Sequence, residues 1–585
     1  MFTLSSYYSS VMVLSKALRT TLLTQRVLMS SLSAQDKLDA LSQKIMSTTL
    51  VSPPSKKWKQ KIKQKEKAKE TSVKLNQPCI IECKNPELNH YQNQSYDKFD
   101  VIPLASKGWN HYKSKGDYFV VNIHPVGYEA ISRIDLGSFE DTGLRPEIID
   151  IFQKKGLTTP TEIQKLGIPS LLSGQSSILV AETGCGKTLS FLAPLVQQIL
   201  AWKASPQYKP DLNAPLGLIV SPGRELVFQI GEVAAWFAEL GITYKVISGT
   251  DMKRKMNAEK EQVDLVIASL GALSKLTTSG TISTRNVRHV ILDEADTLLD
   301  DSFNDKMVHY LSRMKFQQKV NSEGEEDLSD GLQLTLVGAT MPTSLTEILE
   351  EVVDASTLQR IMTSRAHQLL PHVPQKFLRL GPGQKPSELL KIIKRDVKHN
   401  IPVIIFSNKT STCDWISMFL QESGVDSVNL NKAMLIQVRE GQLAKYQQGI
   451  VNVISCTDVA SRGLDTTRAR HVINYDIPYY ISDYIHRAGR TGRHSPHGLI
   501  RGVVTNFVSN NPREIELVQT IEKSVRTMEK TLPNVNANVR RIIHHRYLKK
   551  QETQTERQKQ KQDGETGKSA TGTSSEETPD TERYQ

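Results

Sequence analysis

Short apolar runs alternate with longer amphipathic stretches from about residue 135 onward. Short apolar runs bounded by turns are typical of buried strands, and the stretches between them have helical spacing. This alternation predicts an α/β fold with two similar domains, each a mostly parallel sheet with helices on both faces. The expected strands are residues 178–180, 216–220, 245–247, 264–267, 289–292 and 334–337, and then 403–406, 427–430, 452–455, 471–474 and 503–507.

A glycine-bearing loop joins the first of these strands to a helical pattern that starts at Leu189. In that context, backbone N–H groups face an anion, Lys187 reaches the β- and γ-phosphates, and the Thr188 hydroxyl binds Mg²⁺. An incidental glycine-rich turn is the alternative, and the leading glycine of the usual pattern is replaced by Ala181. The loop residues are Ala181, Glu182, Thr183, Gly184, Cys185, Gly186, Lys187 and Thr188.

An acidic quartet, Asp293-Glu294-Ala295-Asp296, follows the predicted strand 289–292. An Asp at a strand end can hold Mg²⁺ through water, and the adjacent Glu can orient or deprotonate an attacking water, as phosphoryl transfer requires. Acidic clusters are also common on surfaces. The preceding strand and the upstream phosphate loop favour the functional interpretation. In that interpretation Asp293 is a metal ligand, and Glu294 orients or deprotonates the attacking water.

The length and charge of the chain indicate how many domains it has and what kind of partner it binds. A chain of 585 residues suggests two domains with looser extensions, rather than one core. A net charge of +12 and a pI near 9.2 favour a polyanionic partner, with nucleic acid ahead of an anionic membrane. No apolar stretch reaches the roughly 18 to 20 residues of a membrane span.

The five cysteines are scattered and odd in number, which indicates a reducing compartment rather than a disulfide framework. Cys79 and Cys83 lack a second Cys or His pair nearby, so we do not expect a zinc site. Cys185 is interpreted as a small filler of the phosphate loop. Alternatively, its place near a helix N-terminus would lower the pKa of its thiol and make it sensitive to oxidation.

The two ends of the chain differ in composition from the middle. Residues 1–35 contain no acid, carry Lys16, Arg19 and Arg26, and are rich in Ser, Thr and Leu, as in a mitochondrial transit peptide; a disordered tail is the alternative. Residues 36–130 are expected to form a basic extension whose lysine run at 55–70 is a solvated arm, a phosphate contact or a nuclear address. Residues 526–585 are expected to be a disordered tail, first basic and then acidic.

Five ordered motifs together resemble those of the DEAD-box ATP-dependent RNA helicases of superfamily 2. The resemblance covers about residues 135 to 525 and implies two tandem RecA-like domains, an ATP-binding domain at 131–365 and a C-terminal helicase domain at 366–525. The motifs are the loop 181–188, the quartet 293–296, Gly-Ala-Thr at 338–340, Thr-Asp-Val-Ala-Ser-Arg-Gly-Leu-Asp at 457–465 and His-Arg-Ala-Gly-Arg-Thr-Gly-Arg at 486–493.

The same resemblance implies the nucleotide contacts. Gln164 would read the adenine edge, Phe139 would stack on the base, and Asp465 would contact the ribose or its surroundings. Arg490 and Arg493 would reach the γ-phosphate as arginine fingers from the second domain, a role that suits guanidinium groups.

His486 and Asp296 would join the Gly338-Ala339-Thr340 turn in coupling hydrolysis to RNA. The implied ligands are therefore ATP, Mg²⁺ and RNA.

The RNA contacts follow from the resemblance with one departure. Arg224, in Pro-Gly-Arg-Glu-Leu, would meet a phosphate. Ser269 and Gly271 lie in Ser-Leu-Gly-Ala where the family has Thr-Pro-Gly-Arg, so Ala272 replaces the basic residue and puts one contact in doubt. The candidates in the second domain are Lys409, Arg439 and Thr457.

Ala272, Gly338, Ala488 and the segment 103–109 resemble the mitochondrial DEAD-box helicases associated with assembly of the large mitoribosomal subunit. The implied partners are mitochondrial ribosomal RNA and large-subunit assembly proteins. The resemblance implies a monomeric enzyme in the mitochondrial matrix, and the lysine run leaves a nuclear pool open. We expect an RNA-dependent ATPase that opens short duplexes. An ATP-gated RNA clamp or assembly scaffold is the alternative, and a DNA-directed helicase is disfavoured by the resemblance.

Overall fold

The computed structural model describes residues 78–97, 100–122, 137–249, 261–299, 304–316, 331–341, 348–349, 352–354, 357–431, 433–458, 468–495, 498–527, 531–533 and 535. The predicted transit peptide, the lysine run at 55–70 and almost all of the predicted tail lie outside these residues. Asp465 lies outside them too. The helices of the described part are too short or too polar to cross a membrane.

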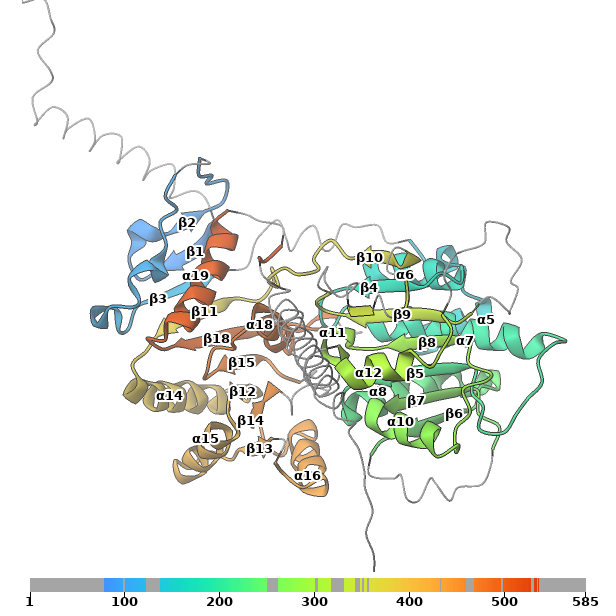
Figure 1. Ribbon diagram of the computed structural model, residues 1–585. Helices are drawn as coiled ribbons and strands as arrows, with labels where there is room; N and C mark the ends of the chain where they lie inside the picture. The colour runs from blue at the N-terminus through green and yellow to red at the C-terminus, as the bar shows by residue number, and fades with distance from the viewer. Residues whose placement is uncertain are drawn as a thin grey trace, which may run out of the picture. The chain divides into compact units, whose positions relative to one another are not determined.

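The first domain is built on a seven-stranded parallel sheet in the order β10-β4-β9-β8-β5-β7-β6 (Figure 1). All six strands predicted for this part of the chain are present, and β10 at the sheet edge is additional. The strands are β4 (Ser177–Val180), β5 (Gly217–Ser221), β6 (Tyr244–Ile247), β7 (Leu265–Ser269), β8 (His289–Leu292), β9 (Gln333–Gly338) and β10 (Gln359–Met362).

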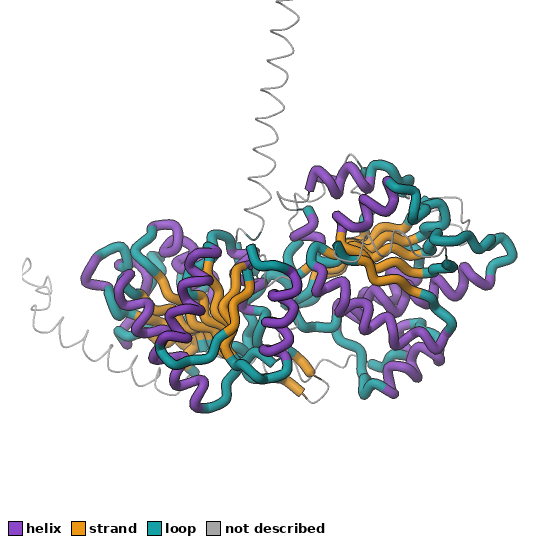
Figure 2. Tube along the Cα trace, turned by 90° about the horizontal axis from the view of Figure 1, so that it is seen from below, coloured by secondary structure: helices purple, strands orange, loops and turns teal. Residues whose placement is uncertain are grey.

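Helices cover both faces of this sheet, and an apolar core fills each face (Figure 2). Alternate side chains of a strand point to opposite faces, which is why Ile178 and Leu179 lie in different cores. The helices are α5 (Pro146–Lys154), α6 (Glu162–Leu172), α7 (Lys187–Ala204), α8 (Arg224–Ala234), α10 (Leu270–Thr278), α11 (Ala295–Leu298) and α12 (Asn304–Leu311).

The second domain has a nine-stranded sheet in the order β13-β14-β12-β15-β18-β11-β3-β1-β2. The first six strands of this order are parallel, and they include all five predicted strands. They are β11 (Gln375–Arg379), β12 (Val403–Ser407), β13 (Val428–Leu430), β14 (Val453–Thr457), β15 (His471–Asn474) and β18 (Val503–Val508).

The helices of the second domain also lie on both faces of its sheet (Figure 2). Among the described helices, α14 and α15 pack on one face, and α16, α18 and α19 pack on the other. The helices are α14 (Lys385–Lys398), α15 (Thr410–Glu422), α16 (Ile436–Gln447), α18 (Ile481–Ala488) and α19 (Pro512–Arg526). A short hairpin, β16 (His494–Ser495) and β17 (Gly498–Leu499), follows α18.

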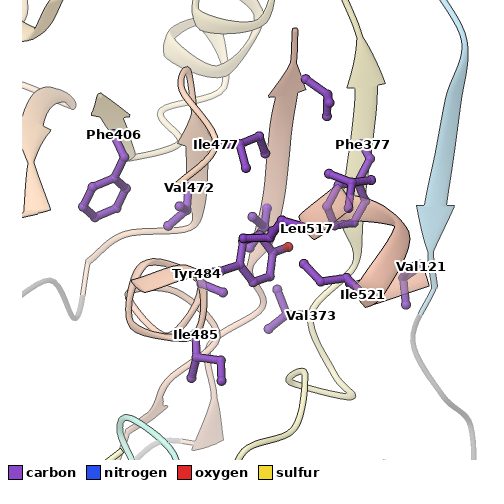
Figure 3. Packing of buried hydrophobic residues seen from close by; sticks show 14 of the residues in the cluster. Val121, Val373, Phe377, Phe406, Val472, Ile477, Tyr484, Ile485, Leu517 and Ile521 are labelled. Atoms are coloured by element: carbon purple, nitrogen blue, oxygen red, sulfur yellow. The ribbon is translucent and has the colours of Figure 1, made fainter. Parts of the chain in front are cut away.

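Residues 78–122 add three antiparallel strands to this second sheet: β1 (Cys79–Cys83), β2 (His90–Tyr91) and β3 (Tyr118–Val121). Strand β3 pairs with β11, and the rings of Phe119 and Phe377 stack with centroids 4.7 Å apart. Figure 3 shows Val121 in the same core as Phe377 and Ile521. The sequence predicted only an extension here. In the structure these residues cover β11, which would otherwise be an open sheet edge.

Candidate ATP and RNA site

The phosphate loop connects β4 to α7, and its backbone geometry depends on glycine. Gly184 and Gly186 have φ values of 80° and 87°, in the left-handed region that favours glycine. Helix α7 begins at Lys187 directly after the loop, so its free N–H groups and positive dipole end face the loop. The Lys187 ammonium donates to the carbonyl oxygens of Ala181 and Glu182, both at 2.8 Å. This is a preformed anion site with a lysine held across it.

Gln164 lies against the same loop. Its Oε1 accepts from the Thr161 N–H at 2.9 Å, and its Nε2 donates to the Gly186 carbonyl at 3.2 Å. A Cβ atom on Gly186 would come within 2.6 Å of that nitrogen, so glycine is needed here for contact as well as for φ. The structure thus brings Gln164 to the loop, with its amide engaged by protein groups.

Phe139 is placed differently from the sequence-based expectation. Its ring is 2% exposed and packs edge-on against Phe152, with centroids 4.9 Å apart. Stacking on an adenine would therefore require the ring or its neighbours to move.

The acidic quartet follows β8, beside the phosphate loop. Burial raises the pKa of Asp293 to about 7, and the charge of Glu294 acts in the same direction, while Lys187 opposes it. The Oε2 atom of Glu294 is buried and has no hydrogen-bond partner among the described residues. The buried carboxylate of Asp293 fits a hydrated cation, because Mg²⁺ in phosphate sites takes one or two carboxylates and keeps several waters. The unsatisfied oxygen of the partly buried Glu294 fits a water molecule.

The end of α18, in the second domain, meets this loop and the quartet. The guanidinium of Arg490 lies 3.8 Å from Oε1 of Glu294. The Thr183 hydroxyl donates to the carbonyl of Gly489 at 3.1 Å. The side chain of Arg493 lies over Gly184, where an added Cβ would be 3.1 Å from its Cγ atom. Both predicted arginine fingers are therefore at the predicted phosphate site.

Asp296 connects the quartet to two other motifs. Its Oδ2 accepts from the backbone N–H and the hydroxyl of Thr340, at 3.1 and 2.6 Å, and contacts Nε2 of His486 at 3.1 Å. Burial opposes ionisation of Asp296, but His486 and the hydrogen bonds from His486 and Thr340 hold its pKa well below its usual range. The predicted coupling residues therefore form one hydrogen-bonded group.

The predicted RNA arginines are engaged across the two domains. Arg224, at the start of α8, contacts Glu440 at 2.6 Å, and Arg439 in α16 contacts Glu225 at 2.8 Å. The Nε atoms of both arginines are buried without a hydrogen-bond partner in the described part of the chain. These two N–H groups are shielded from solvent, so a phosphate oxygen could reach them only after the surrounding side chains rearrange.

The other RNA candidates lie at ends of strands and helices. Ser269 ends β7, exposed Gly271 is in the first turn of α10, and exposed Lys409 precedes α15. Thr457 ends β14, and its buried hydroxyl has no partner among the described residues. The sequence did not single out the two glutamates that pair with the arginines, although the Arg-Glu dipeptide at 224–225 recurs at 439–440.

The burial of Cys185 contradicts one of the two sequence-based predictions for this residue, that its thiol has a low pKa. Burial raises the pKa of its thiol to about 12, and the side chain is 7% exposed. The proposed low pKa and sensitivity to oxidation are therefore wrong. The helix N-terminus is outweighed by the loss of solvent around the sulfur, and Cys185 is a packed filler of the loop.

Comparisons with known proteins agree with this geometry. Residues 161–348 match the DEAD/DEAH box helicase model, and residues 384–495 match the helicase conserved C-terminal domain. The chain is 36% identical over 476 residues to "Probable ATP-dependent RNA helicase DDX28" of Mus musculus, across 79% of this chain and 86% of that protein. The Homo sapiens protein of the same name is 35% identical over 484 residues, with 79% and 87% covered.

The chain belongs to the DEAD-box ATP-dependent RNA helicases. As a DEAD-box helicase it is an RNA-dependent ATPase that binds ATP and RNA.

Solved structures show the same fold. The structure titled "S. cerevisiae Dbp5 bound to RNA and ADP BeF3" is similar with a TM-score of 0.55 and 21% identity, across 67% of this chain and 94% of that one. "DEAD-box helicase Mss116 bound to ssRNA and UDP-BeF" has a TM-score of 0.54 and 22% identity, with 63% and 74% covered. The DEAD-box chain described here therefore has two tandem RecA-like domains.

Proposed function

We propose that this DEAD-box helicase hydrolyses ATP between its two domains while they hold a short RNA tract, and that it remodels ribosomal RNA during assembly of the large mitoribosomal subunit. One observation supports the proposed site of ATP hydrolysis. Beside the phosphate loop, Nη2 of Arg490 lies 3.8 Å from Oε1 of Glu294. The loop with its lysine belongs to one domain and the arginine to the other, so a triphosphate there would contact both.

Each side chain at this junction has a role that fits its position. Lys187 would bind the β- and γ-phosphates, and Glu294 would hold the attacking water through its unsatisfied oxygen. Arg490 and Arg493 would stabilise the charge of the transition state, and Thr188 with Asp293 would hold Mg²⁺. The metal, when bound, neutralises charge on the phosphate oxygens.

RNA would lie along the residues whose donors are unsatisfied or exposed. Arg224, Arg439 and Thr457 each have a buried polar atom without a hydrogen-bond partner among the described residues, and these atoms would become available to RNA when the side chains around them rearrange. Contacts of this type hold a backbone without reading bases, which suits sequence-tolerant binding, and hydroxyl contacts to the 2′-OH separate RNA from DNA. Ser269, Gly271 and Lys409 would add to this surface.

The mitochondrial part of the proposal rests on the leader and on the family resemblance. Residues 1–35 have the acid-free, Ser- and Leu-rich composition of an import signal. The main compartment would be the mitochondrial matrix. There the enzyme would act as a monomer, with mitochondrial ribosomal RNA and large-subunit assembly proteins as its partners. The lysine run at 55–70 would direct any nuclear pool. Fusing residues 1–35 to a fluorescent protein should send it to mitochondria, and a diffuse signal would contradict this part.

Strand displacement distinguishes unwinding from clamping. An ATP-gated clamp is the second candidate, because Ala272 is only 2% exposed and supplies no basic group where the family has arginine. With a short RNA duplex bearing a single-stranded overhang, unwinding predicts ATP-dependent release of the labelled strand by the wild type and none by Lys187→Ala. Glu294→Gln should bind ATP and RNA without turnover. ATP-dependent RNA retention with no released strand would favour the clamp.

A further inference from the structure

A histidine in the segment between β10 and β11 has no role in the site described above. His367 has φ of 63°, in the left-handed region that residues other than glycine rarely adopt. Such a conformation costs about 1 kcal/mol or more and persists only where surrounding contacts fix it, often near functional sites.

Two hydrogen bonds fix His367, and they lead to different domains. Its Nε2 accepts from the Met341 N–H at 3.0 Å, in the turn after β9 of the first domain. Its carbonyl oxygen accepts from the Leu532 N–H at 2.9 Å. Leu532 is 5% exposed and belongs to the core of the second domain. The residue therefore ties a catalytic turn in one domain to the packed interior of the other.

The turn that His367 contacts is the one that Asp296 holds. Thr340 donates its backbone N–H and hydroxyl to Oδ2 of Asp296, and the next N–H, that of Met341, goes to His367. Gly338 begins the turn, and a Cβ there would lie 3.0 Å from the Thr340 carbonyl. Because the two N–H groups are consecutive, a displacement of Met341 also displaces Thr340 relative to Asp296 and its partner His486.

The imidazole is partly buried and borders only a small cavity. His367 lines this cavity of about 10 Å³ together with Glu182, Ala339 and Ala488. Burial lowers the pKa of His367, although the charge of Asp296 opposes this, and so favours the neutral ring whose Nε2 can accept a hydrogen bond. The neutral ring therefore suits the hydrogen bond from the Met341 N–H.

We propose that His367 is a positioning residue for ATP hydrolysis, which holds the turn from Gly338 to Met341 against Asp296 and thereby makes the segment between the domains part of the coupling between RNA binding and turnover. Since the side chain of His367 accepts from the turn at Met341, its loss should change turnover rather than nucleotide binding.

The test uses the full chain and three variants. His367→Leu removes the acceptor, His367→Gln restores one near the position of Nε2, and Gln368→Leu is the control, because the Gln368 side chain donates to the Ser364 carbonyl within the same segment. His367→Leu should lower the RNA-stimulated kcat by about five- to tenfold, the value of one lost hydrogen bond, with KM for ATP and melting temperature unchanged. His367→Gln should recover most of that rate, and Gln368→Leu should match the wild type.

Hydrogen exchange gives a readout that does not depend on activity. The Met341 amide should exchange faster in His367→Leu and regain protection in His367→Gln. Wild-type kcat in His367→Leu would overturn the proposal. So would a loss of kcat that accompanies a lower melting temperature and is not recovered by His367→Gln, because that result indicates a structural role alone.

Discussion

Arg439 and Glu225 form an ion pair of 2.8 Å between α16 of the second domain and α8 of the first. Their chain neighbours form the reverse pair, Arg224 with Glu440, at 2.6 Å. Both arginines are candidate phosphate contacts. Each glutamate therefore accepts from a guanidinium N–H group that an RNA phosphate would otherwise use. The two pairs link the domains through groups that belong to the proposed RNA surface.

The first prediction concerns Glu440→Gln, which removes the negative charge that pairs with Arg224 and keeps the shape of the side chain. RNA affinity without nucleotide should rise about two- to fivefold at low salt, and the salt dependence should steepen by about 0.7 in log–log slope, as for one added phosphate contact. Fluorescence anisotropy with a single-stranded RNA over a KCl series measures both quantities. Glu422→Gln, on exposed Glu422 at the end of α15, makes the same change in net charge and should have a smaller effect. Equal behaviour of the two variants would refute the idea that Glu440 competes with RNA.

The second prediction concerns Glu522, which anchors the N-terminal strands to the second domain. Its carboxylate accepts from the backbone N–H of Ala105 and from the N–H and hydroxyl of Ser106, and it pairs with the buried Arg526. Glu522→Ala should lower the free energy of unfolding by about 3–5 kcal/mol, because it leaves a buried guanidinium without its partner. Urea unfolding of the full chain measures this.

Glu516→Ala serves as the control for Glu522→Ala, since Glu516 is exposed on the same helix. We expect its effect to stay within about 0.5 kcal/mol. Similar unfolding curves for the two variants would show that residues 78–122 are not held through Glu522.

Buried strands were the part of the fold that the sequence predicted well. Residues 289–292 are apolar enough to indicate a strand buried on both faces, and the structure places β8 there. Strand β10 was missed because Gln359 and Arg360 are exposed at the sheet edge. Strands β1 to β3 were missed because their place depends on pairing with β11, more than 250 residues further along the chain, which no local pattern encodes.

The residues of the candidate site also fall into two groups, those that a local motif predicts and those that only the fold brings together. Residues in contiguous motifs, such as Lys187 and Arg490, were predicted because the spacing of a motif is local in sequence. Glu440 and His367 were not, since their roles arise from contacts between distant segments. Phe139 was assigned by resemblance, but its exposure depends on packing against Phe152, which the motif does not determine.

The third prediction concerns pH and the buried His289, which contacts Gln198 and Thr335. Burial lowers its pKa to about 3, from an ordinary value near 6.5. Between these values the unfolded chain binds the extra proton, so this contribution to stability is present at neutral pH and is lost as pH falls. The melting temperature should drop from pH 7 to pH 5, and it should drop less in His289→Gln. His309→Gln, on the exposed His309, should keep the wild-type slope; a wild-type slope in His289→Gln would contradict the assignment.

In the proposed mechanism, ATP is hydrolysed where Arg490 of one domain meets Glu294 of the other. The decisive experiment is to measure the RNA-stimulated kcat of Arg490→Ala at saturating ATP and RNA, with Arg513→Ala on the exposed Arg513 as control. We expect kcat to fall by about 10³-fold or more, with ATP binding retained, because an arginine finger acts on the transition state. A kcat for Arg490→Ala equal to that of Arg513→Ala would contradict it.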